Sequence, residues 1–148
     1  MTTKAAFSPE QWEEVLEGPP NAGMIVATAA RGGLIRESIA MSKSYVEARA
    51  QHGQSELLDE IVQAKPEIDH TIYHSPRELR DGGLEHIRGA VALVESKATA
   101  DELDGYRHFV LALANQVAAS YWEEGRDVST GEAEAIEQIA TALGTTSS

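Results

Sequence analysis

The sequence predicts a single all-α domain of six to seven helices, and three observations support this fold class. Four segments match the capping box, a Ser or Thr followed three residues later by Glu or Gln, which marks the start of a helix; they begin at Ser8, Ser75, Thr99 and Ser129. Aromatic residues make up only 5% of the chain, and Ala, Leu, Ile and Val supply most apolar side chains. That bias favours packed helices over a β-sandwich. Bulky apolar residues also recur at helical steps over residues 103–121.

The longest regular apolar stripe comprises Leu103, Tyr106, Val110, Leu113, Val117 and Tyr121. Alanines occupy much of the remaining surface of this segment. A helix with one bulky stripe and small flanks can be approached closely by several other helices. We therefore predict that a helix near residues 100–124 is central to the fold.

The first helix is predicted at residues 9–17, where Phe7 and Trp12 have the spacing of a hydrophobic staple around the N-terminal cap. Residues 18–20 read Gly-Pro-Pro. Proline lacks an amide donor and restricts the residue before it, so this tripeptide is expected to end the helix. A second, closely packed apolar helix is expected at residues 21–30.

Four further helices are expected, at residues 34–51, 56–64, 76–98 and 130–143. The last of them should fold back antiparallel on the central helix, with Gly144 at the C′ position that suits a left-handed backbone. One domain is expected over residues 1–148, with residues 1–6 and 145–148 as disordered tails.

Length and charge narrow the range of functions. With 148 residues the chain can bury a core without disulfides, and the absence of cysteine excludes thiolate catalysis and Cys-ligated metals. The net charge of -12 opposes binding to nucleic acid and to anionic membranes. No signal-peptide core or membrane-length apolar run is present, so we expect a soluble, cytoplasmic protein.

The first candidate metal site is acidic and lies around the turn before the last helix. Its residues are Glu123, Glu124, Asp127 and Glu132. Calcium and magnesium prefer such oxygen ligands, although the spacing is not that of an EF-hand loop. The alternative is structural, because Ser129 and Glu132 are also explained as a helix cap.

The second candidate metal site consists of Asp69, His70 and His74. Histidines four residues apart share one face of a helix and would suit zinc or another transition metal. Such a site would make the protein a metal-dependent enzyme; the alternative is a polar loop with solvated histidines. His86 and His108 are interpreted as hydrogen-bonding residues on polar helix faces.

No catalytic residues are predicted, because no Ser–His–acid set or nucleophile elbow is present. Neighbouring acids such as Glu13 and Glu14 point to different sides of a helix and so do not share a proton. The sequence therefore favours a non-enzymatic binding or scaffold protein over an enzyme. A protein partner is compatible with this, as is self-association through the small-residue segment 22–30.

The C-terminal segment GRDVSTGEAEAIEQIATALG resembles the end of the repeat in TerB-like tellurite-resistance helical proteins. The residues that fit that pattern are Val128, Ser129, Glu132, Ile136, Ile139, Leu143 and Gly144. The family's Asp-Gly turn does not fit, since the nearest pair, Glu124-Gly125, is one position out of register. The resemblance implies a bacterial all-α protein associated with tellurite resistance or stress, with an acidic metal-binding role for Glu132 and less directly Glu124.

Overall fold

The computed structural model describes residues 4–29, 43, 45–50, 56–63, 76–122 and 130–144. Its named elements are η1 Lys4–Ala6, α1 Pro9–Ala29, α3 Glu56–Gln63, α4 Pro76–Lys97, α5 Ala100–Trp122 and α6 Thr130–Leu143. Residues 45–50 are helical as well. No strand occurs among the described residues, so the predicted all-α class is confirmed. None of the described helices combines the length and apolar character needed to cross a membrane.

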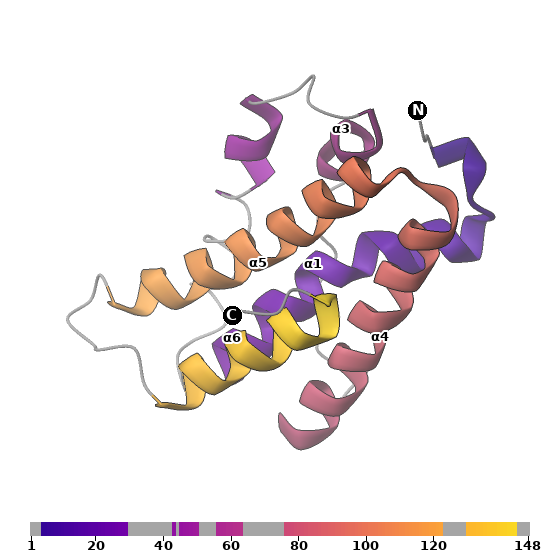
Figure 1. Cartoon of the computed structure of the whole chain (residues 1–148). Coiled ribbons are helices and arrows are strands. Elements are labelled where there is room, and N and C mark those ends of the chain that lie inside the picture. The colour runs from indigo at the N-terminus through magenta and orange to yellow at the C-terminus, as the bar shows by residue number, and fades with distance from the viewer. Residues whose placement is uncertain are drawn as a thin grey trace.

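Helix α5 has the central place that its apolar stripe predicted. It contacts α1, α3, α4 and α6, which are all the other described α-helices with a label (Figure 1). Helix α6 runs antiparallel to it, because Nε of Arg107 near the start of α5 donates to the carbonyl of Leu143 at the end of α6, at 2.6 Å. The most extensive helix contact is between α1 and α4. Every described α-helix contributes fully buried side chains to the core, among them Val15, Ile61, Ile87, Leu113 and Ile139.

Two of the predicted capping boxes are formed in both directions. The Ser8 amide donates to Oε1 of Gln11 at 3.0 Å, and the Gln11 amide donates to Oγ of Ser8 at 3.2 Å. Thr99 and Glu102 make the same pair of bonds, at 3.0 and 3.2 Å. The carboxylate of Glu102 is buried and is satisfied in this way. The other two boxes begin outside the described residues.

The N-terminal segment is more ordered than predicted. Residues 4–6, expected in a disordered tail, form the 3-10 turn η1, and Nζ of Lys97 donates to the carbonyl of Ala6 at 2.9 Å. The predicted staple is present, since the buried rings of Phe7 and Trp12 lie 5.7 Å apart. This aromatic pair attaches the turn to the core.

The predicted break at residues 18–20 is wrong, because α1 continues through both prolines to residue 29. Pro19 removes the amide that would have bonded the carbonyl of Val15 one turn earlier. The hydroxyl of Tyr106 in α5 donates to that carbonyl at 2.7 Å. A tertiary hydrogen bond therefore replaces the helical bond that proline cannot make.

Gly18 makes room for this bond. A Cβ at residue 18 would collide with the Tyr106 hydroxyl. The Tyr106 side chain is 1% exposed, and this burial raises its pKa well above the usual value. The phenol therefore remains protonated and can donate to the Val15 carbonyl, beside the Gly-Pro-Pro segment.

A second glycine sets the distance between α1 and α4. A Cβ on Gly83 would lie 2.9 Å from Cδ1 of Ile25 and 3.4 Å from Oδ1 of Asn21. Because Gly83 has no side chain, the two backbones approach closely here. Residues 22–26 of α1 are buried, and self-association through the segment 22–30 stays a prediction.

We predict that Tyr106→Phe lowers the free energy of unfolding by about 1–3 kcal/mol, because the buried Val15 carbonyl then lacks a donor. Urea unfolding of the variant measures this loss. In a Pro19→Ala background the new amide bonds Val15, so the same substitution should cost less. Tyr45→Phe is the matched control, since it removes the hydroxyl of a second buried tyrosine, whose ring packs edge-on against Phe109. If Tyr106→Phe cost the same free energy of unfolding with and without the Pro19→Ala change, the Tyr106 hydroxyl would not be replacing the helical hydrogen bond to Val15.

We also predict opposite signs for two glycine-to-alanine changes inside helices. Gly18→Ala should destabilise the protein by about 1–3 kcal/mol, because the new methyl group collides with Tyr106. Gly105→Ala should stabilise it by up to about 1 kcal/mol, because nothing lies within 4 Å of the added Cβ and alanine favours a helix. Thermal melting of both variants tests these two predictions. If both substitutions raised the melting temperature, the space at Gly18 would not be needed for the Tyr106 side chain.

Candidate functional site

The metal sites expected from the sequence fall almost entirely outside the described residues. Asp69, His70 and His74 lie outside the described residues. The same holds for the acidic turn, Glu123, Glu124 and Asp127. Residue 132 belongs to α6, but its side chain is not described. Both sites therefore remain predictions.

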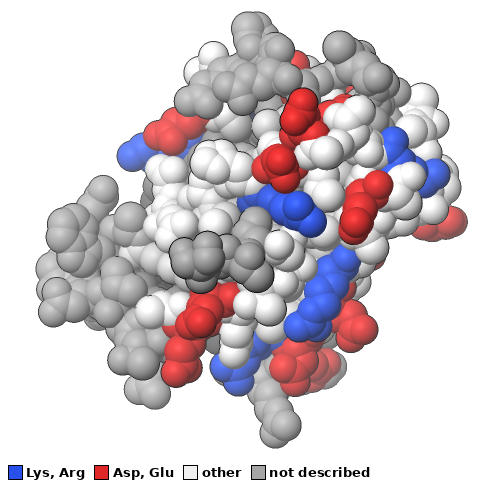
Figure 2. Space-filling model, in the orientation of Figure 1, with Lys and Arg blue, Asp and Glu red and all other residues white. Residues whose placement is uncertain are grey.

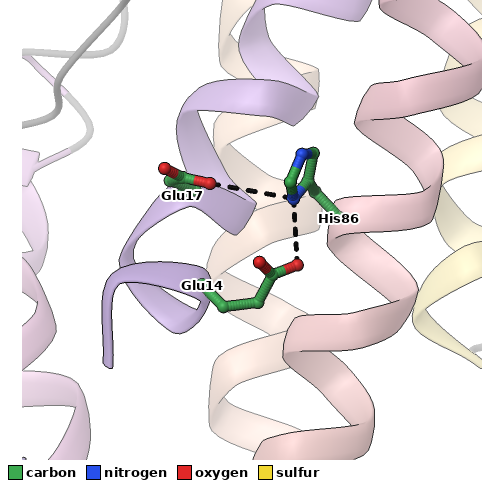
Figure 3. Close-up of side chains that lie close together, drawn as sticks. All are labelled: Glu14, Glu17 and His86. Atoms are coloured by element: carbon green, nitrogen blue, oxygen red, sulfur yellow. Dashed lines mark hydrogen bonds and ion pairs between the residues drawn. The ribbon is translucent and has the colours of Figure 1, made fainter. Parts of the chain in front are cut away.

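A different cluster is formed by Glu14 and Glu17 of α1 and His86 of α4 (Figure 3). The two glutamates are three residues apart and so share one face of α1. That face lies against α4, where the imidazole of His86 points toward both carboxylates. Residues 72 positions apart in the chain, Glu14 and His86, are thereby brought into direct contact.

Both carboxylates approach the same imidazole nitrogen. Nδ1 of His86 lies 3.0 Å from Oε1 of Glu14 and 3.7 Å from Oε2 of Glu17. The shorter distance is a hydrogen bond, and because a carboxylate accepts, the imidazole proton is then on Nδ1. The longer distance is an ion pair when the imidazole is charged. The three ligand atoms lie within 4.8 Å of one another.

The cluster is open to solvent on one side. The side chains of His86, Glu14 and Glu17 are 39%, 29% and 47% exposed. Gly89, one turn after His86, leaves room for the nearest carboxylate: a Cβ there would lie 3.0 Å from Oε1 of Glu14. The site therefore has a backbone wall at Gly89 and a face that water and small ions can reach.

The ligand types indicate what the cluster can bind. An imidazole nitrogen with two carboxylate oxygens suits zinc and related transition metals, which accept nitrogen and oxygen at about 2.0–2.2 Å. Calcium and magnesium prefer oxygen alone. In a tetrahedral zinc site of that bond length, neighbouring ligand atoms are about 3.3 Å apart. The observed 3.0 and 3.7 Å bracket this value.

The cluster was not predicted from the sequence, for two reasons. The predicted end of the first helix after residue 17 concealed the long face that α1 turns toward α4. The partner histidine lies far along the chain, and only tertiary packing places it opposite the glutamates. One signal was available, since Glu14 and Glu17 have the three-residue spacing of a shared helical face. The interpretation of His86 as a hydrogen-bonding residue is confirmed.

Comparisons of the chain with family models, with curated proteins and with solved structures give no match. The TerB resemblance of residues 125–144 therefore stays a prediction. The chemistry of the cluster follows from its three side chains, their separations and their exposure.

Proposed function

We propose that this protein is a non-enzymatic helical binding protein that takes up a divalent transition metal, zinc foremost, between α1 and α4. The observation that carries this proposal is the convergence of Glu14 and Glu17 on one nitrogen of His86. Three protein ligands leave at least one coordination position for water or a further ligand.

The unloaded cluster needs little rearrangement to hold the ion. To coordinate a metal through Nδ1, the neutral imidazole must give up its Nδ1 proton and carry its one proton on Nε2 instead. Both carboxylates are acceptors when ionised and already face the nitrogen.

The ion would act as a clamp between two helices. Glu14 and Glu17 belong to α1 and His86 belongs to α4, and these helices share the most extensive interface of the described structure. An ion that binds only the folded arrangement adds its binding free energy to the stability of that interface. This supports a binding or scaffold role, in which the metal fixes the relative position of the helices.

Two associations from the sequence add separate expectations. The TerB resemblance implies a link to tellurite resistance or stress, and it rests on residues 125–144, none of which belongs to this cluster. A metal-dependent enzyme built on Asp69, His70 and His74 stays the alternative prediction. Both are tested by variants outside α1 and α4.

We predict that zinc raises the melting temperature of EDTA-stripped protein, whereas calcium and magnesium do not. At about a hundred times its dissociation constant, zinc should add roughly 2.7 kcal/mol, which is several degrees for a domain of this size. His86→Ala should abolish the shift. Glu17→Gln should reduce it while leaving the shorter His86–Glu14 contact in place.

The matched control is His108→Ala, which removes an exposed histidine of α5 that is not part of the cluster. It should leave the zinc shift unchanged. Loss of the shift in His70→Ala but not in His86→Ala would move the metal to the alternative site. A calcium shift that depends on Glu132 would favour the acidic turn. No shift with any metal would refute the proposal.

A further inference from the structure

A hollow of about 220 Å³ lies on the side of α5 that faces residues 45–50 and α3. Figure 1 shows both of these segments on the same side of α5. They are joined to each other, because Nε of Arg49 donates to the carbonyl of Val62 at 2.6 Å. None of Glu14, Glu17 and His86 lines this hollow, so it is separate from the metal cluster.

The floor of the hollow is apolar and firmly packed. It is formed by Phe109 and Leu113 of α5, which are buried, with Leu58 of α3 beside them. The ring of Tyr45 packs edge-on against Phe109, with ring centroids 5.2 Å apart. A ligand on this floor would bury apolar surface without first having to order it.

On α5, two of the residues that line the hollow are small, Gly105 and Ala112. Nothing lies within 4 Å of a Cβ built on Gly105, and Ala112 lies two helical turns further along the same wall. His108 lies between them and offers a ring nitrogen at the edge of the hollow. The small side chains at residues 105 and 112 of α5 therefore leave space for a ligand.

The other walls carry negative charge. Glu47 from the segment 45–50 and Asp59 from α3 both line the hollow, and the described lining residues include no Lys or Arg. The chain as a whole has a net charge of -12. Figure 2, in the orientation of Figure 1, shows Lys and Arg side chains interspersed among the acidic ones. Carboxylates at the edge of a partly enclosed apolar hollow favour a cation over a neutral or anionic ligand.

We infer that this hollow binds a small organic cation, a primary amine attached to a compact apolar group. The apolar group would lie on Phe109 and Leu113, and the ammonium would donate hydrogen bonds to Glu47 and Asp59. Drug-sized ligands occupy pockets of about 300–1,000 Å³, so a hollow of about 220 Å³ suits a smaller molecule. This second site goes beyond the proposed metal binding and does not depend on it.

The probe is 2-phenylethylamine, titrated into the full chain in the presence of EDTA and followed by amide chemical shifts and calorimetry. Saturable shifts should be concentrated on α5 between residues 105 and 116 and around residues 47 and 58. The matched neutral and anionic probes, 2-phenylethanol and 3-phenylpropionate, should bind at least about tenfold more weakly, the loss expected for one charge-assisted hydrogen bond.

Two kinds of variant test the geometry. Gly105→Leu fills the hollow at an open position, so it should fold and lose amine binding; Ala112→Leu is the second variant of this kind. Ala92→Leu adds the same bulk at an exposed position of α4 outside the hollow and should bind normally. Glu47→Gln should weaken the amine about tenfold and leave 2-phenylethanol unchanged.

Several results would overturn the inference. These are equal binding of the alcohol and the amine, shifts spread over the whole acidic surface, and unchanged amine affinity in both Gly105→Leu and Ala112→Leu. Because EDTA is present throughout, a failure here leaves the zinc proposal untouched, and a failure of zinc binding leaves this one untouched.

Discussion

The hydrogen bond from the Tyr106 hydroxyl to the Val15 carbonyl is the constraint on which the arrangement of helices depends. Two consecutive prolines would ordinarily end a helix, yet α1 continues through both; α5 supplies a donor for the Val15 carbonyl that Pro19 leaves unbonded, and Gly18 leaves space for it. The continuous helix then presents Glu14 and Glu17 to α4 on its first half and packs Ile25 against Gly83 on its second. The part of the α1–α4 interface beyond the prolines, including the contact between Ile25 and Gly83, thus depends on α1 continuing past residues 18–20, whereas Glu14 and Glu17 precede the prolines.

Local signals in the sequence predicted most of the described fold. Capping boxes, apolar periodicity and the C′ glycine placed α3, α4, α5 and α6 within one or two residues of their ends, and Gly144 has a φ of 80°. These signals act within a few residues and survive folding unchanged. The error at residues 18–20 has the opposite origin. Local chemistry there does favour a break, and only a side chain 91 positions away overrides it.

Each of the two candidate sites combines a local pattern that the sequence shows with tertiary packing that it does not show. The Glu14–Glu17 spacing can be read from α1 alone, but the position of His86 relative to it depends on how α1 and α4 pack, including the close approach at Gly83. The hollow beside α5 needs three elements, since its acids come from residues 45–50 and α3 while its floor belongs to α5. Periodicity marks Phe109 and Leu113 as apolar, and only the packing shows that space remains above them.

The separation of Val15 and Tyr106 along the chain has a consequence for the order of folding. During synthesis the first half of α1, with its own capping box, can form as soon as it emerges. The Val15 carbonyl, four residues before Pro19, gains its donor only when α5, 91 residues later, has been made and has docked. Long-range closure of this kind is slow compared with helix growth. The N-terminal helix should therefore be completed late, together with the joining of α5 to the rest of the domain.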